Sequence, residues 1–192
     1  MVMKVDGVNQ MAAQVFNVKA ISYDNVFSEE RRKRMIRDVK PLLYTKEEWS
    51  EFCNNTKMFP GKQTPYSLHK DPNFYQPILE LQLRAEDILK QRLEVVGSWI
   101  NLTWGKKKDI CWHTHTHSGV KYSVVYYIKQ KPWFSNGTMF RMSNGQERII
   151  RTKQNSMLLF DSTQQHTAPS SPIPFERYTL AMDLRPKLTI SK

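Results

Sequence analysis

The sequence is poor in cysteine, glycine, acidic side chains and long apolar runs. Its two cysteines, Cys53 and Cys111, cannot form the disulfide framework typical of small secreted proteins. No apolar run approaches the ~18 residues that a membrane span needs, and residues 1–16 lack the apolar core of a secretory signal. Seven glycines and ten prolines in 192 residues exclude a collagen-like or low-complexity chain. These absences predict a protein of a reducing compartment, most simply the cytoplasm, without a membrane partner.

Acidic side chains are scarcest in the second half of the chain. The whole sequence has 29 basic and 18 acidic residues, a net charge of +11. Residues 1–100 hold 15 basic and 13 acidic side chains, whereas residues 101–192 hold 14 and 5. A basic surface favours nucleic acid, acidic peptides or anionic small molecules, but a solvated surface without a partner explains the excess equally well.

The first half of the chain shows helical patterns. Ser28 is a good N-cap for a helix over 29–39, and a Thr-Lys-Glu-Glu capping box predicts a short helix over 45–54. Apolar residues at intervals of three and four predict the longest helix over 76–92. Residues 1–20 have no firm pattern and fit an edge strand or a loose end.

After Gly97 the pattern changes to about eight short strands with no helical segment among them. The stretches richest in strand-forming residues are 98–104, 122–128, 139–142, 147–151, 157–160 and 178–182. Asn144-Gly145 is a strong hairpin signal between two of them. Helices followed by strands indicate an α+β, mainly β, fold, for which two facing antiparallel sheets in a jelly roll are the favoured architecture. We expect one compact domain, with a helical support region over 1–96 and the jelly-roll core over 97–192.

Four of the five histidines fall in two places and suggest a metal site. His113, His115 and His117 alternate with threonines, and His166 follows about fifty residues later. Residues two apart in a strand share a face, and three imidazoles are costly in a core because each ring has two nitrogens to satisfy. Neutral imidazole is the commonest metal ligand and suits Fe, Zn, Cu and Ni. Two histidines of the run, joined by His166, therefore form a candidate metal site.

Arg177 lies eleven residues after His166, at the start of the last predicted strand. Its planar guanidinium matches a carboxylate in geometry. An arginine at a strand start is ordinary by itself, so its spacing from His166 gives it significance. Close to a metal, it would anchor an anionic co-substrate.

These residues occur in an order and spacing that resemble a known family. The elements are Trp99, Gly105, His113-Thr114-His115, Tyr126-Tyr127-Ile128, Phe160, His166 and Arg177. Over about 97–184 they resemble the 2-oxoglutarate- and Fe(II)-dependent oxygenases, closest to the prolyl-hydroxylase-like branch and to small oxygenases of phages and marine bacteria. The resemblance implies a double-stranded β-helix, a form of jelly roll, with N-terminal supporting helices.

The resemblance also implies roles for individual residues. His166 matches the distal metal ligand, and Arg177 matches the residue that pairs with the far carboxylate of 2-oxoglutarate. Tyr127 matches a position whose hydroxyl often binds the same carboxylate, with Tyr126 as the alternative. Thr179 faces the same way as Arg177 and can add a hydroxyl.

The chain departs from the family pattern at one metal ligand. The family motif has His-x-Asp or His-x-Glu, but here a histidine stands in the acidic place. We favour His113 and His115 as ligands, with His117 as the alternate to His113. Asp109 is the nearest preceding carboxylate that could substitute.

The implied activity is that of a non-haem oxygenase, most simply a hydroxylase. It would couple the oxidative decarboxylation of 2-oxoglutarate to succinate with O2-dependent oxidation of a prime substrate, which stays open among protein, peptide and nucleic acid. One alternative is a cupin-type three-histidine dioxygenase or isomerase that does not use 2-oxoglutarate. Against this alternative, many cupins have a Glu four residues after a clustered histidine, and none stands at such a position here. Another is a non-enzymatic metal-binding jelly-roll module. The spacing of Arg177 favours the oxygenase over both.

Overall fold

The structure is a computed structural model that describes residues 2–5, 8–15, 18–45, 61–104, 112–130, 137–169 and 175–188. Within these residues the larger sheet consists of β1 (Val2–Val5), β2 (Val8–Val15), β3 (Val18–Tyr23), β4 (Lys62–Gln63), β5 (Leu93–Thr103), β6 (Tyr122–Lys129), β9 (Met157–Asp161) and β11 (Arg177–Pro186). The smaller sheet consists of β7 (Thr138–Arg141), β8 (Glu147–Ile150) and β10 (His166–Thr167). All of these strands pair antiparallel with their neighbours.

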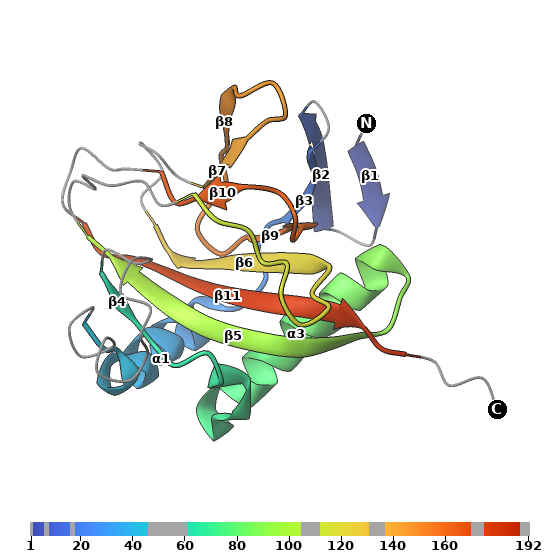
Figure 1. Cartoon of the computed structure of the whole chain (residues 1–192). Coiled ribbons are helices and arrows are strands. Elements are labelled where there is room, and N and C mark those ends of the chain that lie inside the picture. The colour runs from blue at the N-terminus through green and yellow to red at the C-terminus, as the bar shows by residue number, and fades with distance from the viewer. Residues whose placement is uncertain are drawn as a thin grey trace.

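The strand order is that of a jelly roll. The larger sheet runs β1-β2-β3-β9-β6-β11-β5-β4, and the smaller sheet runs β10-β7-β8. The smaller sheet lies over one face of the larger sheet, and the helices α1 (Glu29–Val39) and α3 (Pro72–Leu89) lie along the other face (Figure 1). The predicted double-stranded β-helix with N-terminal supporting helices is confirmed.

The helices begin where their caps are. Ser28 accepts a hydrogen bond from the Arg31 N–H at 3.2 Å, as expected of the N-cap of α1. The helix α3 begins at Pro72 instead of residue 76, because the Asp71 carboxylate caps it by accepting from the Asn73 N–H at 2.8 Å. The helix ends at Leu89, and the next residue, Lys90, caps it in a left-handed conformation (φ 51°). A short 3-10 helix, η1 (Lys40–Leu42), directly follows α1, and a second one, η2 (Leu68–Lys70), directly precedes α3.

Two groups of buried side chains stabilise this arrangement. The larger group fills the space between the helices and the larger sheet, and it includes Phe74, Leu81, Ile100, Tyr126 and Leu180. The smaller group packs between the two sheets and includes Tyr127, Phe140, Leu158 and Phe160. Consecutive residues of β6 therefore face opposite layers, as strand geometry requires.

Several sequence predictions can be compared with the described elements. The hairpin at Asn144-Gly145 is present: β7 and β8 pair, and Gly145 adopts a positive φ of 80°. The strand predicted to begin at residue 98 begins at Leu93, and the weakly patterned residues 1–20 contribute β1, β2 and part of β3. The helix predicted over 45–54 falls almost wholly outside the described residues. None of the described helices combines the length and apolar character that a membrane span requires.

Candidate metal centre and anion pocket

Three histidine side chains converge between the two sheets. His113, His115 and His166 each offer one ring nitrogen, and these ligand atoms lie within 4.8 Å of one another. The ring centroids of His113 and His166 are 4.4 Å apart, and the centroid of His115 lies about equally far from both, at 5.0 and 5.1 Å. Nitrogen ligands about 2.1 Å from one ion stand about 3 Å apart when their bonds are at right angles. Small side-chain movements therefore suffice to bring all three onto one metal.

Backbone hydrogen bonds fix the positions of these three residues. The His113 N–H donates to the His166 carbonyl at 3.2 Å, and the His166 N–H donates back at 3.0 Å. The His115 N–H donates to the Ser162 carbonyl at 2.9 Å. Because β10 is also paired with β7, backbone hydrogen bonds keep the main chain of the three histidines close together.

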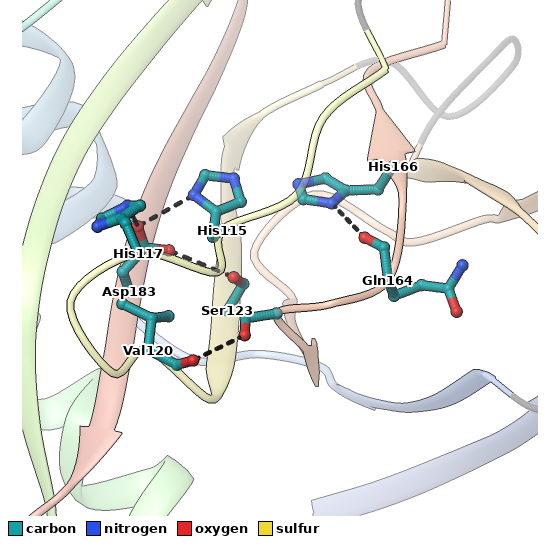
Figure 2. A network of polar contacts seen from close by, with 8 residues as sticks. His115, His117, Val120, Ser123, Gln164, His166 and Asp183 are labelled. Carbon is teal, nitrogen blue, oxygen red and sulfur yellow. Dashed lines mark hydrogen bonds and ion pairs between the residues drawn. The ribbon is translucent and has the colours of Figure 1, made fainter.

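In His115 and His166, the second ring nitrogen already has a polar partner. The His115 Nδ1 lies 3.0 Å from an Asp183 carboxylate oxygen, and the His166 Nδ1 lies 2.9 Å from the Gln164 carbonyl (Figure 2). A ring that donates from Nδ1 presents the lone pair of Nε2, which is the arrangement typical of metal-binding histidines. His115 and His166 are thus both prepared to bind a metal through Nε2.

His166 is neutral and enclosed by aromatic rings. Burial, with lesser contributions from His113 and His115, holds the pKa of His166 well below its usual value. Phe160 meets His166 edge-on with ring centroids 4.7 Å apart, and Trp99 stacks on His115 at 5.5 Å. A neutral imidazole is the protonation state that binds metal, and the aromatic walls limit access of water.

The structure corrects the expectation that His113, His115 and His117 share one face of one strand. Within residues 112–121, only His113 makes a strand-type bridge. The chain then turns at His117, where the Val120 N–H bonds the His117 carbonyl at 2.9 Å and Ser118 and Gly119 have positive φ. The side chain of His117 is 60% exposed, and its Nε2 lies 3.4 Å from Asp183. Its position favours His113 over His117 as the partner of His115 and His166, while Asp109 lies outside the described residues.

Arg177 lines the same cavity and is buried, with 7% of its surface exposed. Its Nη2 donates to the Gly137 carbonyl at 2.8 Å, and its guanidinium lies 5.5 Å from the ring centre of Tyr127. No carboxylate among the described residues pairs with it, and its Nε lacks a hydrogen-bond partner. Burial lowers the pKa of Arg177, yet a guanidinium stays charged at neutral pH. A buried, unpaired cation is costly unless a ligand brings the anion.

The other residues implied by the family motif are placed by the strand register. Thr179 pairs with Tyr127 across β6 and β11 and lines the cavity. The Tyr127 hydroxyl lies 2.7 Å from the Thr138 hydroxyl, and burial raises the pKa of Tyr127. Tyr126 faces the helices instead, where its hydroxyl donates to the Asn155 side chain at 2.8 Å. Tyr127 therefore lies between the two sheets and contacts Thr138 of the cavity wall, but it does not itself line the cavity.

Several buried polar atoms of the cavity wall lack partners among the described residues. They are the Nε of Arg177, the Nε2 of Gln63, the Oδ1 of Asn101 and the Oγ1 of Thr167. Buried polar groups are normally hydrogen-bonded, and each exception calls for an explanation. A polar ligand in this cavity would satisfy them, so the residues present fit a metal together with an anionic organic molecule.

Two residues of the cavity wall, Asp183 and Gln63, were not predicted from the sequence. Asp183 carries a recognisable signal, because it is an acidic residue within the otherwise buried strand β11 and is six residues beyond Arg177. Alternate residues of a strand share a face, so Arg177, Thr179 and Asp183 all reach the cavity. Gln63 carries no such signal, since only the pairing of β4 with β5 brings it to the wall.

Comparison with known proteins identifies the fold. No protein-family model matches the sequence, and no curated protein matches it either. Among solved structures, HygX from Streptomyces hygroscopicus with nickel and 2-oxoglutarate bound is 12% identical with a TM-score of 0.62, covering 88% of this chain and 83% of that chain. A Pseudomonas putida prolyl-4-hydroxylase is 12% identical with a TM-score of 0.60, covering 90% and 95%. The 2-oxoglutarate complex of a viral collagen prolyl hydroxylase from Paramecium Bursaria Chlorella virus-1 is 12% identical with a TM-score of 0.56, covering 88% and 96%. These similarities confirm, at the level of the fold, the resemblance to the 2-oxoglutarate-dependent oxygenases.

Proposed function

We propose that this protein is a non-haem Fe(II)- and 2-oxoglutarate-dependent oxygenase that hydroxylates its prime substrate. The observation that carries the proposal is one cavity that holds both a three-histidine cluster and a buried, unpaired arginine. A metal-binding module needs only the first, and a simple anion site needs only the second. A co-substrate that chelates a metal at one end and carries a free carboxylate at the other uses both.

The histidines would hold the iron. His113, His115 and His166 occupy three positions and leave others open for small ligands, as non-haem oxygenases require. Iron bound there supplies the reaction with dioxygen in which 2-oxoglutarate is decarboxylated to succinate and the prime substrate is hydroxylated. The neutral His166 and the bonded Nδ1 of His115 keep the nitrogen lone pairs available.

Arg177 would bind the far carboxylate of 2-oxoglutarate. Its Nη2 is held by the Gly137 carbonyl, so the guanidinium is oriented while its Nε is still free to donate. The hydroxyl of Thr179, which also lines the cavity, can add a hydrogen bond to the same carboxylate. Trp99 and Phe160 contact the histidine rings and form an apolar part of the cavity wall.

The similar structures support the proposed metal and co-substrate. HygX has been solved with nickel and 2-oxoglutarate, and separately with iron, and the viral collagen prolyl hydroxylase has been solved with 2-oxoglutarate. HygX has also been solved with hygromycin B bound, whereas the other two proteins are named as prolyl hydroxylases. The shared fold therefore supports the co-substrate and leaves the class of prime substrate open.

Anaerobic titration of the purified protein with Fe(II) and 2-oxoglutarate tests the proposal. We expect a metal-to-ligand charge-transfer absorption band, because this band requires both molecules on one metal. On admission of oxygen, the band should decay and succinate should form. Fe(II) binding without a band would refute the use of 2-oxoglutarate and favour a cupin-type enzyme, while the absence of Fe(II) binding would refute the metal centre.

A further inference from the structure

Asp183 is the one acidic side chain among the described residues that line the cavity. It is 1% exposed and has three polar contacts. Its Oδ2 lies 3.0 Å from the Nδ1 of His115 and 3.4 Å from the Nε2 of His117, and its Oδ1 accepts from the Ser123 hydroxyl at 3.3 Å (Figure 2). Within the part of the chain that the structure describes, no lysine or arginine pairs with it.

The position of Asp183 follows from the register of β11. Asp183 lies opposite Ser123 of β6 and opposite Gly97 of β5, and the register of the second pairing shifts directly after it. Gly97 has no side chain to cover the carboxylate. A β-bulge at this place is a common means of directing one side chain toward a site.

A buried carboxylate without a fixed cation is energetically costly. The Ser123 hydroxyl and two imidazole N–H groups are modest compensation for burying it. A divalent ion on the far nitrogen of His115 would supply positive charge one imidazole ring away. Chains of carboxylate, histidine and metal are common in metalloproteins, where the carboxylate fixes the tautomer and raises the basicity of the ring.

We propose that Asp183 is the positioning carboxylate of the metal centre and takes the electrostatic role of the carboxylate ligand that the histidine run lacks. This inference rests on the proposed metal centre. Three neutral imidazoles leave a divalent ion with a charge of +2, and Asp183 behind His115 reduces the local charge to +1. Two histidines and one directly bound carboxylate give the same total. The chain thus keeps the charge of such a centre while moving the anion outward by one ring.

His117 has a different role in this arrangement. Its side chain is largely exposed and contacts Asp183 from the solvent side. It acts as a second partner of the carboxylate, whereas His113 and His166 face His115 from the other side. The competing arrangement places the metal directly on His115, His117 and Asp183, whose ligand atoms also lie within 4.8 Å of one another.

Metal affinity of four variants separates these arrangements. Anaerobic calorimetric titration with Fe(II) alone compares the wild type with Asp183→Asn, His117→Gln, His113→Ala and Ser123→Ala. Asp183→Asn keeps the volume and a hydrogen-bond acceptor but removes the charge, so we expect affinity to fall by about 10- to 100-fold. His113→Ala should lose at least as much, while His117→Gln and Ser123→Ala should stay within about threefold of the wild type because neither removes a ligand or the charge.

A second readout reports the ligands themselves. With Cu(II) as a probe, pulsed electron paramagnetic resonance should show the same histidine nitrogens in the wild type and in Asp183→Asn. Thermal unfolding in the presence of a chelator shows that each variant is folded before metal is added. If Asp183→Asn does not fold, Asp183→Ser removes the same charge with a smaller side chain and takes its place.

Two results would overturn the inference. The first is an Fe(II) affinity of Asp183→Asn within about twofold of that of the wild type. If Asp183→Asn also gives the charge-transfer band with 2-oxoglutarate, the proposed function stands while the role of Asp183 is refuted. The second is a large loss in His117→Gln with none in His113→Ala, which would place the metal directly on Asp183. Failure of the wild type to bind Fe(II) would instead refute the metal centre and, with it, this inference.

Discussion

Replacing Arg177 by methionine should weaken binding of 2-oxoglutarate at least ~30-fold while leaving the protein folded. Methionine has a similar length, so the substitution removes the charge and the hydrogen bonds without opening a large cavity. Arg177 is the buried cation of the described cavity wall, and no described carboxylate pairs with it. Its charge therefore contributes to ligand binding more than to folding.

The magnitudes of the two effects differ. Removing one partner of a buried, hydrogen-bonded charge pair costs about 2–5 kcal/mol of binding, which corresponds to about 30-fold to several thousand-fold weaker affinity. For folding, relief of the desolvated cation is favourable, while the Gly137 carbonyl loses its 2.8 Å bond. An unsatisfied buried carbonyl costs about 1–3 kcal/mol, so the net change in the free energy of unfolding should stay within about 2 kcal/mol.

Calorimetric titration of the Ni(II)-loaded protein with 2-oxoglutarate measures the first effect, and chemical denaturation of the metal-free protein measures the second. Arg151→Met is the matched control, because Arg151 is exposed and lies outside the cavity wall. Arg177→Lys should fall between the two variants, since lysine keeps the charge but lacks the planar fork. Affinity of Arg177→Met within threefold of the wild type would refute the assignment, and so would a loss of more than about 4 kcal/mol of stability.

Two further predictions concern stability. The Asn155 side chain accepts hydrogen bonds from the Phe27 N–H (2.9 Å) and the Tyr126 hydroxyl (2.8 Å) and donates one to the Phe27 carbonyl (2.6 Å). Asn155→Ala should therefore lower the free energy of unfolding, measured by chemical denaturation, by about 2–4 kcal/mol. Asn144→Ala in the exposed turn should lower it by less than about 1 kcal/mol, and equal losses in the two variants would contradict the prediction. Burial lowers the pKa of His166, so below about pH 6.5 the unfolded chain binds the proton that the folded protein rejects. Thermal unfolding of the metal-free protein should consequently become easier as the pH falls from 7 to 5, and a slope that is unchanged in His166→Gln would assign the effect to other groups.

Residue type and spacing were enough to select four residues of the candidate site. Histidine is scarce in this chain, whereas Arg177 stands out among eleven arginines only by its spacing from His166. The structure places His113, His115, His166 and Arg177 around one cavity. The hairpin at Asn144-Gly145 and the cap at Ser28 are likewise short-range features, because their physical causes lie within a few residues.

Long-range choices could not be predicted from the pattern. The alternation of histidines suggests one continuous strand, but the turn at His117 separates that residue from the cluster. Tyr126 and Tyr127 are the same residue type, and only the pairing of β6 with β11 sends one toward the helices and the other into the core between the two sheets. Strand register fixes such choices, since a shift of one residue reverses every side chain.

The sequence by itself determined the fold class, the scarcity and spacing of the histidines, and the absence of a carboxylate from the histidine run. These properties depend on residue identity and local periodicity. Only the tertiary structure decided that Asp183, 68 positions from His115 in the chain, lies 3.0 Å from its ring. The reason is physical: β11 pairs with β6 within the larger sheet, and this pairing sets Asp183 opposite Ser123, close to the segment that precedes β6. Residues so far apart in the sequence meet only when the strands take this register.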